Sequence, residues 1–184
     1  MSDPSSPPVD EEARRPTGQD QLARPHTAAI IGGGAGGLMA AEVLATAGVA
    51  VTVFDHMPSM GRKLLLAGRG GLNLTHSEPI YDLLDQMREA KGRLEPAIRA
   101  FPPERLLAWS ASLGEDTFVG TSGRVFPTSM RATPLLRSWL RRLEWLGVDL
   151  RPRHAWKGWT VDGDLRFDCS DGTTVTCSPG ATVL

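Results

Sequence analysis

The chain reads Thr27-Ala-Ala-Ile-Ile31, then Gly32-Gly-Gly-Ala-Gly-Gly37, a run of small residues to Ala47, and Gly48-Val-Ala-Val-Thr-Val-Phe-Asp55. This order indicates a short apolar strand, a glycine turn, a helix, a second strand and a terminal acid. Gly32 permits a tight turn, Gly34 lets a phosphate approach the backbone, and Gly37 permits close packing of helix on strand. The helix N-terminus offers free N–H groups to such a phosphate. The stretch therefore predicts a βαβ unit that binds a dinucleotide.

Asp55 closes the second strand, about 20 residues after the glycines, where a carboxylate accepts hydrogen bonds from an adenosine ribose. An acid at this position argues against a bound 2′-phosphate, which disfavours NADP here and leaves FAD or NAD. A glycine turn without any ligand is the alternative interpretation. The order of the strands, helix and acid favours the dinucleotide. The valines at 49, 51 and 53 predict a parallel strand that is covered on both faces.

A second group of candidate residues lies in the loop predicted over residues 56–76. Its glycines permit close backbone approach, and its cations neutralise phosphate charge. A solvated surface loop is the alternative, but the fingerprint just upstream favours ligand contact. The predicted cofactor-binding residues are Gly32, Gly34, Gly37 and Asp55 in the fingerprint, and Gly61, Arg62, Lys63, Gly68, Arg69, Gly70, Gly71 and Asn73 in this loop.

Composition and charge limit the classes of protein that fit. The 184 residues carry a formal net charge of −1, which gives no electrostatic case for nucleic acid or a membrane surface. No apolar run reaches the ~18 residues of a membrane helix. Residues 1–26 are rich in proline and charge and predict a disordered tail that is not a secretory signal, which indicates the cytoplasm. Residues 181–184 predict a strand with no terminating turn, so we expect the N-terminal part of a longer protein.

Residues 77–147 predict a mainly helical region. Ser77 is expected to cap a first helix with Leu84 and Met87 on its apolar stripe, and a second helix is expected over residues 94–101. Pro102-Pro103 is expected to open a third, and two short strands are expected over 117–126. A strong helix begins at Thr133 or Pro134. The arginines here could form an RNA- or phosphate-facing patch, although a solvated helix face is favoured; they are Arg131, Arg137, Arg141 and Arg142.

Residues 148–180 predict a strand and then a three-stranded β-meander with turns at 162–164 and 171–172. A two-residue turn at Asp171-Gly172 would set Cys177 opposite Arg166, so that Cys169 and Cys177 point to opposite faces. This arrangement predicts neither a disulfide nor a dithiol relay. Trp156 and Trp159 are expected on opposite faces by the same parity. The histidines at 26, 56, 76 and 154 lack metal-ligand spacing, so no metal site is predicted.

Five segments together resemble the BaiN-like family of FAD-dependent flavoproteins. They are the 32–37 glycines, Asp55, Gly61-Arg-Lys63, Gly68-Arg-Gly-Gly-Leu-Asn-Leu-Thr-His76 and Gly123-Arg-Val-Phe-Pro127. The 68–76 loop departs from the commoner family loop, since its arginine has moved to Arg69 and Leu72 replaces a cysteine. It indicates a distinct branch. The resemblance implies an α/β, FAD/NAD(P)-binding Rossmann-like domain of the glutathione-reductase type, with a parallel sheet, helices and a meander, truncated within this chain.

The same resemblance implies the chemistry. FAD would lie on the fingerprint, with residues 68–73 near the flavin end, and NAD(P)H would be the reductant for a carbon–carbon double bond. Family substrates range from steroid-like acids to a uridine in ribosomal RNA, so a small molecule is favoured and RNA is the alternative. The proton donor for this reduction is expected in the missing substrate domain, and His76 and Tyr81 are the alternatives within this chain. We expect an enzyme at full length and an inactive fragment over residues 27–184, which lacks a substrate domain and a C-terminal FAD segment. A non-catalytic dinucleotide-binding module is the rival class.

Overall fold

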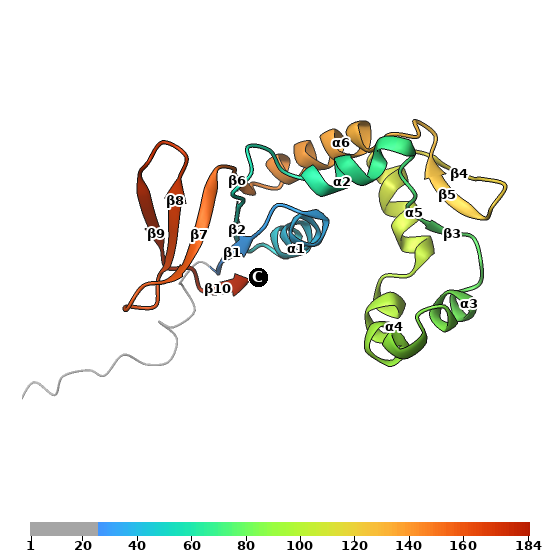
Figure 1. Ribbon diagram of the computed structural model, residues 1–184, viewed down its shortest axis with the longest axis horizontal. Coiled ribbons are helices and arrows are strands. Elements are labelled where there is room, and N and C mark those ends of the chain that lie inside the picture. The colour runs from blue at the N-terminus through green and yellow to red at the C-terminus, as the bar shows by residue number, and fades with distance from the viewer. Residues whose placement is uncertain (1–25) are drawn as a thin grey trace, which may run out of the picture.

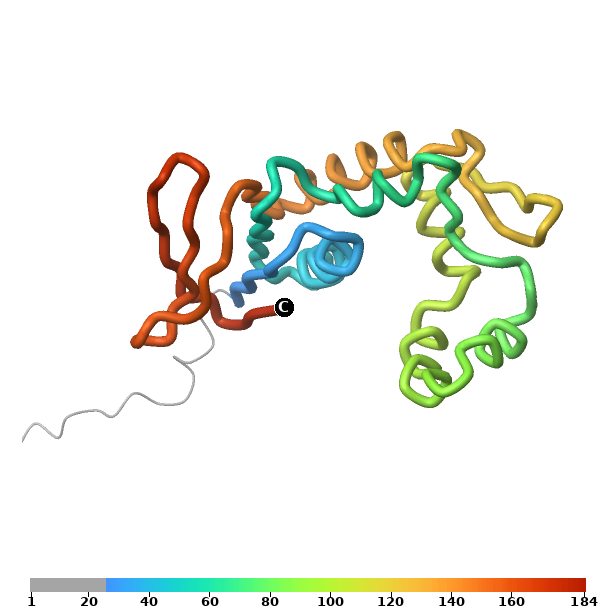
Figure 2. The backbone as a smooth tube through the Cα atoms, viewed as in Figure 1, coloured from blue at the N-terminus to red at the C-terminus, as the bar shows by residue number. Residues whose placement is uncertain are grey.

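The structure is a computed structural model that describes residues 26–184. The predicted disordered tail lies outside the described residues, apart from His26. Figure 1 shows a central sheet, a meander beside it, and a helical region that projects to the other side. The backbone trace in Figure 2 shows that residues 77–113 project away from the central sheet. The segments before and after them connect them to the rest of the chain.

The central sheet confirms the βαβ prediction. Its four strands run parallel in the order β10-β1-β2-β6. They are β1 (Thr27–Ile31), β2 (Ala50–Phe54), β6 (Asp149–Arg151) and β10 (Ala181–Val183), and α1 (Ala35–Thr46) connects β1 to β2. Val51 and Val53 pack in a core with α1, whereas Phe54 packs on the opposite face. Both faces of β2 are therefore covered, as its run of valines predicts.

The meander covers the face of the sheet that α1 leaves free. It consists of β7 (His154–Trp159), β8 (Leu165–Cys169) and β9 (Thr174–Cys177). Leu165 and Phe167 are fully buried against Ala29 and Phe54. The Phe54 and Phe167 rings stack with their centroids 4.0 Å apart. This contact fixes the meander beside the end of β2, which carries Asp55.

The predicted register of the meander is wrong by one residue. Cys177 pairs with Leu165 and not with Arg166. The turn holds three residues, because the Cys169 N–H donates to the Thr173 carbonyl at 2.8 Å and Gly172 takes a positive φ of 86°. Cys169 lies four residues from Leu165 along β8, so the two cysteines share a face but lie about 13 Å apart along it. Both thiols are free, and burial raises the pKa of the Cys177 thiol.

The prediction that the two tryptophans of β7 lie on opposite faces is also wrong. The register shifts between Trp156 and Trp159, where Gly158 has a φ of 100°. This β-bulge inserts an extra residue and reverses the parity that simple alternation gives. The two indole rings meet edge to face with centroids 5.9 Å apart.

The projecting region begins with an element inside the predicted 56–76 loop. Leu64 and Leu65 pack against the main core and make part of this loop helical. The elements are α2 (Arg62–Ala67), η2 (Gly68–Gly70), β3 (Thr75–His76), α3 (Ile80–Asp85), η3 (Arg88–Ala90), α4 (Lys91–Ala100), α5 (Pro103–Ser112), β4 (Thr117–Val119), β5 (Arg124–Pro127) and α6 (Ala132–Trp145). The strands β3, β5 and β4 form a small antiparallel sheet.

The first predicted helix is shorter than its apolar pattern suggests. Ser77 does not cap it, because the Ser77 N–H donates to the Gly123 carbonyl at 2.8 Å and continues the pairing of β3 with β5. The helix α3 starts after Pro79 and ends at Asp85, which leaves Met87 outside it. The second predicted helix, α4, has no buried residue and carries Pro96 in its interior. The third, α5, begins at Pro103 as predicted.

The helix α6 joins the projecting region to the sheet through a half-buried acid on α1. Glu42 accepts hydrogen bonds from the Trp139 indole at 2.6 Å, the Trp109 indole at 3.1 Å and the Arg142 guanidinium at 3.1 Å. Arg142 also donates to the Ser112 carbonyl. Arg142 therefore does not belong to an outward basic patch, which corrects its predicted position. Glu42 connects α1, α5 and α6.

Replacing Glu42 with alanine is expected to lower the free energy of unfolding by about 2–3 kcal/mol, because it leaves two indole N–H groups and a guanidinium without their acceptor. Glu42→Gln should recover part of this loss. The exposed Glu144→Ala on α6 is the matched control and should change stability by less than about 0.5 kcal/mol. Urea unfolding of the purified protein measures all three variants. Equal stabilities for Glu42→Ala and Glu144→Ala would refute the role of this acid.

Candidate dinucleotide-binding site

The glycine turn after β1 is built as the fingerprint requires. Gly32 has a φ of 111°, and its N–H donates to the Phe54 carbonyl at 2.7 Å. A Cβ on Gly37 would overlap the Gly32 carbonyl oxygen and lie 3.2 Å from Ile30 Cγ2, so only glycine allows α1 to pack this closely. A Cβ on Gly34 would meet no atom within 4 Å. Packing therefore requires Gly37, whereas no packing contact within the protein requires glycine at position 34.

A cavity of about 490 Å³ opens at this turn, beside the N-terminus of α1. Gly34 is the N-cap of α1 and has no side chain that could satisfy the first N–H groups of the helix. Free N–H groups and the helix dipole favour an anion at this end. The residues that line the cavity are Gly32, Gly33, Gly34, Gly37, Asp55, His56, Met57, Arg62, Lys63 and Leu66.

Two cations reach this cavity from the start of α2. Arg62 and Lys63 line it together with the glycines, although about 30 residues of chain separate the two segments. A backbone hydrogen bond of 2.7 Å from the Gly61 N–H to the Gly33 carbonyl holds the segments together. Gly61 itself adopts the left-handed conformation with a φ of 67°, and its α-carbon packs against Leu136. The structure thus brings together a helix N-terminus and two positive side chains, a combination that suits a pyrophosphate.

Asp55 joins the end of β2 to the glycine turn. Its Oδ2 accepts from the Gly33 N–H at 2.6 Å, and its Oδ1 accepts from the Met57 N–H at 2.7 Å. Its side chain is 12% exposed, on the wall of the cavity. Each carboxylate oxygen keeps a further lone pair for a ligand hydroxyl. The acid therefore both fixes the shape of the turn and presents acceptors to the cavity.

Replacing Asp55 with asparagine is expected to cost about 1–3 kcal/mol of stability even without a ligand, because the amide retains a single acceptor oxygen for two backbone N–H groups. Asp149→Asn is the matched control, since Asp149 is also an acid of the central sheet, at the start of β6, but pairs with Arg151 at the surface. That substitution should cost less than about 1 kcal/mol. Thermal unfolding of the ligand-free variants compares them. Equal melting temperatures would contradict the structural role of Asp55.

The remaining loop residues do not reach this cavity. Gly68 packs against Ala132, where a Cβ would clash, and Gly71 has a φ of 120° beside Met130 and Phe126. Arg69 and Gly70 are exposed and lie outside the lining of the cavity. Asn73 lines a separate cleft, and its amide donates to the Thr75 carbonyl at 2.8 Å when its nitrogen and oxygen are assigned from the surrounding hydrogen-bond partners. The contact of these five residues with a cofactor stays a prediction.

The candidate proton donors differ in their surroundings. His76 lines the cleft that Asn73 also lines, with its Nε2 2.9 Å from the Ser122 carbonyl oxygen and its Nδ1 3.3 Å from the Glu78 backbone nitrogen. Tyr81 is 64% exposed, stacks under Arg99 and is not among the residues that line this cleft. Both ring nitrogens of His76 are therefore engaged with the backbone. Within residues 26–184, no group of three metal-ligating side chains converges.

The family described as "HI0933-like protein Rossmann domain" matches residues 26–183. The chain belongs to this HI0933-like family. The predicted fold class, an α/β Rossmann-like domain of the FAD/NAD(P)-binding type with a parallel sheet and a three-stranded meander, is confirmed. The family match supports the predicted resemblance. The separate branch that the 68–76 loop indicates stays a prediction.

Proteins similar to this HI0933-like chain match different shares of its length. A ribosomal RNA dihydrouridine synthase from Haemophilus influenzae is 51% identical over 49 residues, which is 27% of this chain and 12% of that protein. Two solved structures share the fold: THI4 from Thermovibrio ammonificans (TM-score 0.51, 16% identity, covering 89% of this chain and 58% of that one), and a 3-ketosteroid-delta4-(5alpha)-dehydrogenase from Rhodococcus jostii RHA1 in complex with 4-androstene-3,17-dione (TM-score 0.55, 14% identity, covering 92% and 48%).

The chain therefore spans 12% of its curated relative and about half of the solved structures it resembles. No helix among the described residues is both long and apolar enough to cross a membrane.

Sequence reasoning missed part of this HI0933-like site. Gly33 donates to Asp55 and has no room for a side chain, since a Cβ there would overlap Met60 Sδ. Met57 contributes a backbone N–H, and His56 and Leu66 line the cavity. The sequence does carry a signal for Gly33. The fingerprint G-x-G-x-x-G accepts any residue at its second position, so a third glycine there indicates an additional constraint on that position. The contributions of Met57 and Leu66 depend on the path of the chain and leave no signal in the sequence.

Proposed function

We propose that the protein is a flavoprotein oxidoreductase that binds FAD at the fingerprint cavity, takes hydride from NAD(P)H and reduces a carbon–carbon double bond of a small organic molecule. The observation that carries this proposal is the cavity that joins the open face of Gly34, the Asp55 carboxylate and the cations Arg62 and Lys63. Membership of the HI0933-like family and a fold shared with a ketosteroid dehydrogenase support the class of reaction.

The residues of the cavity fit the chemical parts of FAD. The N-terminus of α1 and the space at Gly34 suit the pyrophosphate, with Arg62 and Lys63 to offset its charge. Asp55 suits the adenosine ribose, since its two oxygens keep acceptor capacity after binding the turn. FAD, when bound, would supply hydride transfer from a nicotinamide to one carbon of the double bond, and a proton from water or a donor group would complete the reduction at the other carbon. The chain itself contributes binding and orientation, and no nucleophile–base pair of its own enters the proposal.

An RNA substrate is the second candidate. The short segment that is 51% identical to a ribosomal RNA dihydrouridine synthase favours it. Arg137 and Arg141 are exposed on α6 and add a small positive surface. This surface is weaker than predicted, because Arg142 is paired with Glu42. The net charge of −1 gives no general attraction to a polyanion. A small molecule therefore remains the favoured substrate.

Anaerobic spectroscopy on the full-length protein separates these functions. NADH or NADPH should bleach the visible absorbance of the purified protein, and an enone should restore it with a saturated product found by mass spectrometry. Restoration by uridine-containing RNA and not by enones would favour the RNA substrate. If neither nicotinamide bleaches the absorbance, the protein is a non-catalytic dinucleotide-binding module. If only dioxygen restores it and the product gains an oxygen atom, the protein is a monooxygenase and the proposed reaction is wrong.

A further inference from the structure

A second cleft lies in the projecting region and shares no lining residue with the fingerprint cavity. It has a volume of about 650 Å³, which is within the range of sites for small organic molecules. Its walls come from β3, α3, α4, α5 and the β4–β5 hairpin. Its lining includes the apolar residues Leu83, Met87 and Phe101 and the polar residues His76, Glu78 and Arg124.

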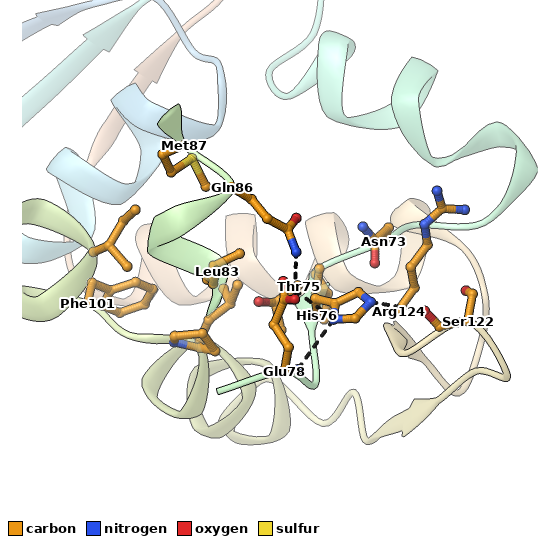
Figure 3. A pocket seen from close by; sticks show the side chains of 14 residues that line it. Asn73, Thr75, His76, Glu78, Leu83, Gln86, Met87, Phe101, Ser122 and Arg124 are labelled. Atoms are coloured by element: carbon orange, nitrogen blue, oxygen red, sulfur yellow. Dashed lines mark hydrogen bonds and ion pairs between the residues drawn. The ribbon is translucent and has the colours of Figure 1, made fainter. Parts of the chain in front are cut away.

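The cleft has an apolar end and a polar end, as Figure 3 shows. Leu83, Met87 and Phe101 lie together on one side, and Ile98 and Leu106 also line the cleft. Asn73, Ser122 and Arg124 lie on the other side. The apolar residues here are half-buried rather than fully packed, and α4 buries none of its side chains. A ligand with an apolar body would cover surface that this helix leaves in contact with water.

The charges of the cleft leave one cation free for a ligand. Glu78 accepts from the Gln86 amide with Oε2 at 2.6 Å, while its buried Oε1 lies 3.6 Å from His76 Nδ1. The Glu78 carboxylate in the middle of the cleft therefore accepts a hydrogen bond from Gln86 and faces the His76 imidazole. Arg124 is exposed at the polar end and makes no ion pair with any residue of the described chain. An unpaired guanidinium across the cleft from an apolar wall suits a carboxylate or sulfonate that has an apolar body.

We propose that this cleft is a binding site for a small organic anion, with its apolar body against Leu83, Met87 and Phe101 and its anionic group on Arg124. Binding would order the α3–α4 segment, which has few buried contacts of its own. We infer further that this anion is the class of molecule that the protein reduces, and this step rests on the proposed function. The binding of the anion does not depend on it.

Two fluorescent probes with the same rings test the site on the full-length protein. Anilinonaphthalene sulfonate carries the anionic group, and phenylnaphthylamine lacks it. Arg124→Gln should weaken the sulfonate about tenfold, since one charge-assisted contact is lost, and should leave phenylnaphthylamine within about twofold. Phe101→Ser should weaken both probes. Arg166→Gln, on the exposed side of β8, is the matched control and should change neither.

Hydrogen exchange gives a second readout that does not require a variant. The sulfonate should slow exchange in residues 80–101 and leave the meander unchanged. Equal affinity of wild type and Arg124→Gln for the sulfonate, or protection outside the cleft, would overturn the site. FAD binding is measured in parallel. Loss of FAD binding with an intact Arg124-dependent probe site would count against the proposed function alone, and the converse would count against this inference alone.

Discussion

Gly37→Ala is expected to destabilise the protein by about 3 kcal/mol, because the added methyl group overlaps a backbone oxygen that cannot move aside. The overlap is with the Gly32 carbonyl, and the same methyl group would crowd Ile30 Cγ2 at 3.2 Å. To relieve it, α1 would have to shift away from β1. That shift would open the core between Leu38 and the sheet and would move the helix N-terminus off the cavity. Urea unfolding measures the loss, and FAD affinity should fall with it.

Gly36→Ala is the control one residue away. A Cβ at Gly36 meets nothing within 4 Å, and the residue is exposed on α1. Alanine has the higher helix propensity, so this variant should be unchanged or more stable by about 0.5–1 kcal/mol. Two adjacent glycines in one motif thus have opposite expected signs. If Gly37→Ala were as stable as Gly36→Ala, the close packing of α1 on β1 described here would be wrong.

Gly34→Ala is expected to separate ligand binding from folding. The new methyl group meets no protein atom within 4 Å, and the φ of −78° at Gly34 is open to any residue. Stability should fall by no more than about 1 kcal/mol, the cost of alanine at an N-cap. The methyl group occupies the space at the helix N-terminus where a pyrophosphate would lie. FAD affinity should therefore fall about hundredfold or more, as backbone contacts to the phosphates are lost.

Gly37→Ala and Gly34→Ala are expected to affect different properties of the protein. Gly37→Ala should lose stability and flavin together, whereas Gly34→Ala should lose only flavin. Isothermal titration with FAD and urea unfolding, applied to the same preparations, measure both quantities. Unchanged FAD affinity in a well-folded Gly34→Ala protein would show that the pyrophosphate of FAD does not bind beside Gly34.

The fingerprint could be predicted from the sequence because its constraints are local. Gly32, Gly37 and the apolar run of β2 each follow from steric and burial rules that act within a few residues. The predicted roles of Gly34 and Asp55 belong to the same class, and the structure places both on one cavity. Arg62 and Lys63 line the same cavity, since the chain after β2 returns to the glycine turn, where the Gly61 N–H donates to the Gly33 carbonyl.

The predictions that were wrong depended on features that the sequence pattern does not specify. The hairpin at Ser170 has three residues and not two, which shifts the register and puts both cysteines on one face. A bulge at Gly158 shifts the register of β7 and puts Trp156 and Trp159 on one face as well. Arg142 was expected in solvent because its partner, Glu42, lies 100 residues away in the chain. Asn73 is a different case: it lines a separate cleft because α2 carries the chain away from the sheet, and its contact with a cofactor stays a prediction.

The central claim is that the fingerprint cavity binds FAD, and flavin titration of the full-length protein tests it most directly. Wild-type protein, stripped of any bound nucleotide and shown by unfolding to be native, should bind one equivalent of FAD and quench its fluorescence. We expect this saturable binding in wild type and Gly36→Ala, and its loss in folded Gly34→Ala. A native wild-type protein that takes up no FAD, or that binds FAD equally well with alanine at position 34, would contradict it.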